Sequence, residues 1–193
     1  MTEPLKVLIV GGVACGPKTA CRLKRLLPEA EITVIDKDAI VSYGACGLPY
    51  YVEGCFDDIE ALTHPPAGIP RTPAFFEKAK GVRVLTRTEA LGIDRAAKTV
   101  RVRNVDTGAE SILPYDKLVL ATGGEAFKPR LPGIDQENVW FMTHPDHASG
   151  LVAAITAQNP RRAVMVGAGF IGMEMAEALR LKGLEVTVIE MAP

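Results

Sequence analysis

The chain contains one pattern twice: an apolar strand, a glycine turn, an amphipathic helix and a second apolar strand that ends on a carboxylate. The first copy spans residues 7–36 and ends on Asp36, and the second spans residues 163–190 and ends on Glu190. This combination is typical of a unit that binds a dinucleotide by its pyrophosphate. Two copies predict two bound dinucleotides, and a protein that holds two of them usually transfers electrons between them.

The second turn carries the complete pattern of three glycines. In such turns the first glycine allows the tight bend, the second lets the backbone approach the pyrophosphate, and the third lets the helix pack on the sheet. The phosphates then bind N–H groups at the helix N-terminus. We expect contacts from Gly167, Gly169, Phe170, Ile171 and Gly172. Glu190 would accept hydrogen bonds from the ribose, so NADH is favoured and NADPH remains possible.

The first turn departs from this pattern, because Val13 occupies the middle glycine position. A valine there would crowd a pyrophosphate unless the loop is reshaped. Asp36 nevertheless ends the following strand, where a ribose ligand is expected. The expected contacts are Gly11, Gly12, Val13, Ala14, Gly16 and Asp36. The alternative is a structural repeat that binds nothing.

Composition narrows the classes of function. The chain has 193 residues, of which 48% are hydrophobic, and it carries 22 basic and 23 acidic side chains. This balance gives no field that would attract nucleic acid, and no apolar run approaches the roughly 18 residues that a membrane span needs. The start of the chain lacks the basic region of a secretory leader. Four cysteines without a disulfide or metal spacing indicate a cytoplasmic protein with reduced thiols and no bound metal.

Periodicity predicts an α/β fold. We expect parallel strands at 6–10, 31–35, 82–86 and 117–123, helices at 17–27, 73–80 and 146–157, a loop at 61–71, and an antiparallel meander at 90–113. We assign residues 1–147 to a Rossmann-like first nucleotide-binding domain and residues 148–193 to the start of a second one. Because the second copy stops after two strands, we expect the chain to be the front part of a longer protein.

Two further segments carry a family resemblance. The segment Ser42-Tyr-Gly-Ala-Cys-Gly-Leu-Pro-Tyr50 and the strand Tyr115-Asp-Lys-Leu-Val-Leu-Ala-Thr-Gly123, together with the two units, resemble the pyridine nucleotide-disulfide oxidoreductases. The resemblance is to their single-cysteine branch, which includes coenzyme A-disulfide reductases, NADH-dependent persulfide or polysulfide reductases, and NADH oxidases and peroxidases. It implies a homodimer with FAD in the first unit and the nicotinamide cofactor in the second. The further cofactor contacts that it implies are Lys37, Ser42, Ala90, Ala121, Thr122, Gly123 and Glu174.

The resemblance implies that Cys46 is the redox residue. The sequence places Cys46 at the start of a short helix, whose N-H groups and dipole favour a thiolate. Family members with a redox disulfide carry a second cysteine five positions on, where this chain has Tyr51. Cys46 must therefore cycle with a small thiol partner or as a sulfenic acid. The alternative is a buried, inert cysteine.

Two observations favour coenzyme A disulfide or a coenzyme A persulfide or polysulfide as substrate. Oxidases and peroxidases of the family carry a histidine in the first turn as a proton donor, where this chain has Ala14. Lys18, Arg22 and Arg25 share one face of the first helix, where coenzyme A-disulfide reductases bind phosphates. Ser42 and Tyr43 would then line the approach of the pantetheine, whereas Ala45 replaces an asparagine of some members and leaves the substrate open.

Three alternatives stay open at this point. The basic face can be an ordinary solvated surface. The enzyme can be an NADH oxidase or peroxidase whose proton donor lies elsewhere. The chain by itself can be an inactive nucleotide-binding fragment.

Overall fold

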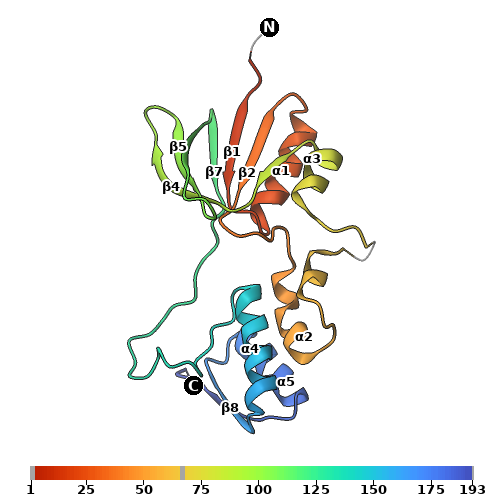
Figure 1. The fold of residues 1–193 in the computed structure, drawn as a ribbon, viewed down its shortest axis with the longest axis vertical. Helices are drawn as coiled ribbons and strands as arrows, with labels where there is room; N and C mark the ends of the chain where they lie inside the picture. The colour runs from red at the N-terminus through yellow and green to blue at the C-terminus, as the bar shows by residue number, and fades with distance from the viewer. Residues whose placement is uncertain (1–2, 66–67, 193) are drawn as a thin grey trace. The chain divides into compact units, whose positions relative to one another are not determined.

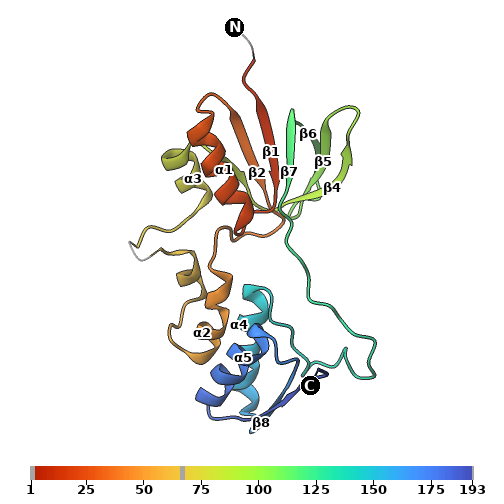
Figure 2. The same cartoon turned by 180° about the vertical axis from the view of Figure 1, so that it is seen from behind.

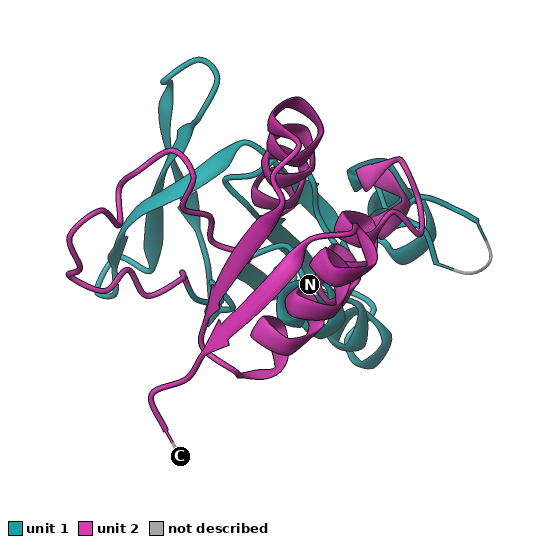
Figure 3. Ribbon diagram, turned by 90° about the horizontal axis from the view of Figure 1, so that it is seen from below, with its two compact units in different colours: residues 1–44, 63–124 teal, residues 45–62, 125–193 magenta. Residues whose placement is uncertain are grey.

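The computed structural model describes residues 3–65 and 68–192. The chain forms two compact units (Figure 3). Unit 1 comprises residues 1–44 and 63–124, and unit 2 comprises residues 45–62 and 125–193. The segment that carries Cys46 thus belongs to unit 2, although it precedes much of unit 1 in the sequence.

Unit 1 is built on a four-stranded sheet in which each neighbouring pair of strands is parallel. Its strands are continuous apolar runs, as expected for strands covered on both faces. The order is β3-β2-β1-β7, with β1 at Lys6–Val10, β2 at Glu31–Ile35, β3 at Arg83–Leu85 and β7 at Lys117–Leu120. The predicted parallel sheet is confirmed, and its carboxyl edge carries the first glycine turn and Asp36.

Two helices, α1 (Cys15–Leu26) and α3 (Pro73–Lys80), cover one face of this sheet (Figure 1). Ile9, Val34 and Phe76 are buried between these layers. At the start of α3, Thr72 accepts a hydrogen bond from the Phe75 N–H over 3.2 Å. Helix α1 starts two residues earlier than predicted, since the backbone turns directly from the glycine turn into the helix.

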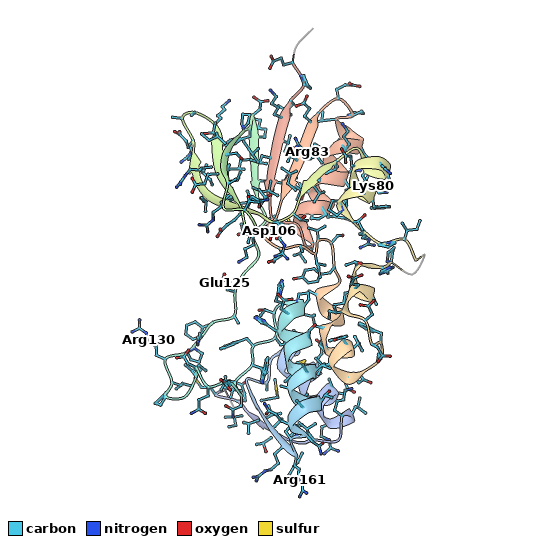
Figure 4. All side chains as sticks on the ribbon, in the orientation of Figure 1. Lys80, Arg83, Asp106, Glu125, Arg130 and Arg161 are labelled. Carbon is cyan, nitrogen blue, oxygen red and sulfur yellow. The ribbon has the colours of Figure 1, made fainter. Side chains whose placement is uncertain are left out.

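An antiparallel sheet covers the other face (Figure 2). It consists of β4 (Thr88–Asp94), β5 (Thr99–Asn104) and β6 (Glu110–Pro114), and it confirms the predicted meander. Val100 and Val102 pack against Leu8, Val10 and Ile35 of the parallel sheet. The β5–β6 turn carries Asp106 (Figure 4), which pairs with Arg87 over 3.8 Å.

Unit 2 contains the second strand–turn–helix–strand copy. Its elements are η1 (Ala45–Gly47), α2 (Leu48–Glu53), η2 (Ile59–Thr63, whose last residue belongs to unit 1), α4 (Pro145–Gln158), β8 (Arg162–Val166), α5 (Phe170–Leu181) and β9 (Glu185–Ile189). Strands β8 and β9 are parallel. Helices α2, α4 and α5 share a core built around Leu48, Val52, Ala148, Met175 and Leu179.

One expected loop is partly wrong. Residues 61–63 belong to the 3-10 helix η2, which Asp58 starts by accepting a hydrogen bond from the Glu60 N–H over 2.9 Å. Residues 66–67 of that predicted loop lie outside the described residues. No helix in the described part of the chain is long and apolar enough to cross a membrane.

Candidate functional site

The first glycine turn joins β1 to α1 in a shape that only glycine permits. Gly11 has a φ of 114° and donates its N–H to the Ile35 carbonyl over 2.9 Å. A Cβ at Gly11 would collide with the carbonyl oxygen of Ala121, and a Cβ at Gly16 would collide with that of Gly11. The turn therefore packs against the end of β2 and against the residue that follows β7, and α1 starts directly after it.

Asp36 closes this turn. Its buried carboxylate accepts hydrogen bonds from the Gly12 N–H over 2.5 Å and from the Asp38 N–H over 2.9 Å. A Cβ at Gly12 would lie only 3.0 Å from the Asp36 Oδ2 atom. The expected ribose ligand is thus fixed by the same turn that would hold the pyrophosphate.

The second turn repeats this geometry. Gly167 has a φ of 100° and donates its N–H to the Ile189 carbonyl over 2.8 Å. A Cβ at Gly172 would collide with the carbonyl oxygen of Gly167. Glu190 accepts a hydrogen bond from the Ala168 N–H over 2.6 Å, as Asp36 does from Gly12. The two copies share the same internal contacts, although Val13 replaces the middle glycine in the first turn.

Backbone hydrogen bonds hold Glu190 in its charged form. The N–H of Ala192, followed by those of Ala168 and Met191, lowers the pKa of Glu190. The bonds from Met191 and Ala192 reach the second carboxylate oxygen over 2.7 and 2.8 Å. Sequence reasoning found both carboxylates but missed these backbone partners, because the strand–turn contact exists only in the folded unit.

Both helices that follow the turns fit a phosphate group. Among the described residues, no side chain caps the N-terminus of α1 or α5, and the first turn of each contains no acidic residue. The N–H groups there are free of competing carboxylates and carry the positive end of the helix dipole. The arrangement suits a pyrophosphate in either unit.

The other predicted cofactor contacts of unit 1 occupy different positions. Ala121 lies at the carboxyl edge, where its N–H bonds the Val10 carbonyl over 2.7 Å, and Thr122 and Gly123 follow it. Lys37 is exposed beside Asp36. Ala90 is half-buried in β4 and packs against the core shared by the two sheets.

In unit 2 the remaining predicted contacts are exposed. Phe170 and Ile171, in the first turn of α5, are 91% and 54% exposed. Glu174 lies on the exposed side of the same helix.

Cys46 is exposed in η1, directly before α2. Pro49 stands in the first turn of α2, and Gly54 ends the helix with a φ of 98°. The alternative of a buried cysteine is wrong, because Cys46 is exposed. The structure places Cys46 and the first turn in different compact units.

The other three cysteines differ from Cys46 in their surroundings. Cys21 packs against the unit 1 core, and the Cys15 thiol lies 3.9 Å from the Thr19 hydroxyl. Loss of hydration, followed by the charge and hydrogen bond of Glu53, raises the pKa of Cys55. These contacts disfavour a thiolate at Cys55.

The expected substrate residues fall into two groups. Lys18, Arg22 and Arg25 are exposed on α1, whereas the neighbouring Lys24 donates to the Ala30 carbonyl over 2.8 Å and serves the fold. Ser42 and Tyr43 are 8% and 7% exposed and are part of unit 1. The basic face is thus open to solvent, and the Ser42–Tyr43 pair is packed inside the unit.

Metal binding gains no support from the described residues, among which no group of three or more potential ligand side chains gathers. His144 instead accepts a hydrogen bond from the Asp146 N–H over 3.2 Å and caps α4. His147 accepts one from the Thr143 N–H over 3.4 Å. Hydrogen bonds to the backbone near the start of α4 thus engage both histidines.

Residues 5–193 match the family described as pyridine nucleotide-disulphide oxidoreductase, and the chain belongs to that family. It is 43% identical to a NAD-dependent persulfide reductase from A. fulgidus of known structure, with a TM-score of 0.92 over 97% of this chain and 34% of that one. It is 32% identical to a coenzyme A disulfide reductase of Staphylococcus haemolyticus (95% of this chain, 40% of the relative). It is 34% identical to an NADH oxidase of Methanocaldococcus jannaschii (98% and 41%). The chain thus spans about two fifths of these two curated relatives.

Proposed function

We propose that the polypeptide containing this chain is an FAD- and NADH-dependent oxidoreductase that reduces coenzyme A disulfide or a coenzyme A persulfide through Cys46. The observation that carries this proposal is the pair of matching turns, each closed by its own carboxylate, in a chain whose exposed Cys46 lies directly before α2. The relatives named as a persulfide reductase and a coenzyme A disulfide reductase support it.

We assign FAD to the first turn and NADH to the second. The α1 N-terminus would hold the FAD pyrophosphate, and Asp36 would bind its adenosine ribose. Glu190 would bind the corresponding ribose of NADH, and its charge disfavours the 2′-phosphate of NADPH. Bound FAD would accept two electrons from NADH and pass them to sulfur.

Cys46 supplies the nucleophile. Its thiolate attacks one sulfur of the coenzyme A disulfide, the S–S bond breaks, and one coenzyme A leaves as thiolate. A mixed disulfide between Cys46 and the second coenzyme A remains. Two electrons, originally from NADH, cleave this bond and return Cys46 to the thiolate, so that NADH and one proton convert one disulfide into two thiols.

The exposed basic face of α1 is the proposed docking surface for the coenzyme A phosphates. Arg22 and Arg25 offer planar guanidinium groups that bind phosphate through paired hydrogen bonds, and Lys18 adds a third positive charge. None of the three takes part in an ion pair recorded for the described residues. We propose that the enzyme is a cytoplasmic homodimer.

A second candidate is an NADH oxidase, favoured by the match to the M. jannaschii relative. Ala14, which is exposed at the start of α1, argues against it, because an alanine cannot donate a proton to a reduced oxygen species.

The test uses the full polypeptide encoded in frame with these 193 residues. NADH oxidation is followed without oxygen in the presence of coenzyme A disulfide, and then in air without any disulfide. We expect bound FAD, rapid turnover with the disulfide and little turnover in air. A protein without flavin would refute the proposal, and fast oxygen consumption without disulfide turnover would establish the oxidase instead.

A further inference from the structure

Ser42 has a backbone conformation that serine rarely adopts. Its φ is 55°, in the left-handed region, and its side chain is buried within unit 1. This conformation is sterically unfavourable for an L-residue other than glycine. A strained backbone of this kind persists only where its surroundings impose it, and it is concentrated at functional sites.

The strained residue is bonded to the first glycine turn. The Ser42 N–H donates to the Gly12 carbonyl over 2.8 Å, while the Gly12 N–H donates to Asp36 over 2.5 Å. Both polar backbone groups of Gly12 are therefore fixed. The preceding residue, Val41, is buried, and its Cγ1 atom would be 2.8 Å from a Cβ at Gly12.

We propose that Ser42 acts through its backbone as a positioning residue that holds the first turn in its cofactor-binding shape. This inference rests on the proposed binding of FAD at that turn. Val13 stands where such turns usually have their middle glycine, so the turn must keep its shape without that glycine. The bonds from Asp36 and Ser42 fix it from two sides. The side chain of Ser42 then needs no direct contact with FAD or substrate.

The inference predicts a specific order among variants of Ser42. Ser42→Val disfavours the left-handed backbone, because a β-branched residue adopts it rarely. The turn then spends less time in the binding shape, which lowers the apparent affinity for FAD by the lost fraction. We expect a loss of about tenfold, which corresponds to about 1.4 kcal/mol. Ser42→Gly adopts the same backbone freely and should rescue binding.

Lys98→Val is the matched control. Lys98 has a φ of 51° in the exposed turn between β4 and β5. Lys98→Val therefore places a valine in the left-handed region, as Ser42→Val does, but away from the glycine turn. It should lower the free energy of unfolding and leave the FAD dissociation constant unchanged. A loss of FAD affinity in Ser42→Val but not in Lys98→Val separates positioning from general destabilisation.

The experiment measures FAD binding to the deflavinated full polypeptide by flavin fluorescence, and urea unfolding of each variant. Ser42→Val binding as tightly as the parent overturns the inference, as does a Ser42→Gly variant that is as weak as Ser42→Val. If Ser42→Val does not fold, hydrogen exchange of the parent decides: the Ser42 amide must be protected, and free exchange overturns the inference. A parent that binds no FAD overturns the proposed function instead.

Discussion

Adding a single methyl group to either turn should weaken the binding of one nucleotide and leave the binding of the other unchanged. Gly16→Ala and Gly172→Ala make the same chemical change at equivalent positions of the two copies. In each case the new Cβ would collide with the carbonyl oxygen of the first glycine of its own turn. The Cβ is fixed by the helix backbone and the carbonyl by the turn backbone, so neither atom can rotate away and the helix must move from the turn.

The size of the effect follows from the overlap. At Gly16 the Cβ would also lie 3.0 Å from the Gly11 carbonyl carbon and 3.3 Å from Ile9, and at Gly172 it would lie 3.2 Å from the Gly167 carbonyl carbon. Forcing one methyl group into a packed site costs about 1–3 kcal/mol. If this free energy destabilises the nucleotide-binding shape of the turn, the dissociation constant of its nucleotide rises about 5- to 150-fold.

The assay is a pair of titrations on each variant of the full polypeptide, with FAD fluorescence for the first turn and NADH binding for the second. Gly16→Ala should weaken FAD only, and Gly172→Ala should weaken NADH only. Gly124→Ala is the control, since a Cβ at Gly124 would meet no atom within 4 Å. If both variants weaken the same nucleotide, or if neither weakens any, the assignment of one dinucleotide to each turn is refuted.

Three further predictions concern other parts of the chain. Because the pKa of Glu190 is lowered, its carboxylate should stabilise the fold above the ordinary glutamate pKa and lose this contribution only as the pH falls through the lowered pKa. The melting temperatures of the parent and Glu190→Gln should therefore converge only in strong acid. Glu190→Gln should also raise the ratio of NADPH to NADH affinity. Gly150→Ala would place a Cβ 2.8 Å from the ring of Trp140, the single tryptophan. We expect a red shift of the tryptophan fluorescence with little change in stability, because the gain in helix propensity of about 1 kcal/mol offsets the crowding. An unchanged emission spectrum would contradict this packing of Gly150 against Trp140. Arg22→Ala should raise the KM for coenzyme A disulfide and leave the KM for NADH unchanged. Arg95→Ala, which removes the same charge from the exposed β4–β5 turn, should change neither KM. Equal effects of the two variants would indicate that the basic face of α1 is an ordinary solvated surface.

The strands, the turns and most helices could be predicted because they depend on local patterns. Helix α3 matches its predicted bounds, since Thr72, Pro73 and Gly81 mark its ends. The parallel pairing followed from continuous apolar strands joined by helices. The two carboxylates could be found because they follow the strands directly.

The missing parts of the prediction depend on contacts distant in sequence. Nothing in the local sequence marks Ser42 as left-handed, because its conformation follows from the bond to Gly12, thirty residues earlier. The membership of the Cys46 segment in unit 2 likewise depends on packing of α2 against α4 and α5. The 3-10 helix η2 was missed because one Asp58 cap outweighs the loop composition after it.

The central claim is that electrons from NADH reach an external disulfide through Cys46. It is tested most directly by comparing Cys46→Ser with Cys55→Ser, a second exposed cysteine of unit 2, in the full polypeptide without oxygen. We predict that NADH bleaches the flavin absorbance in both variants, and that only Cys46→Ser fails to release coenzyme A thiol from its disulfide. Thiol release by Cys46→Ser at the rate of Cys55→Ser would contradict the account.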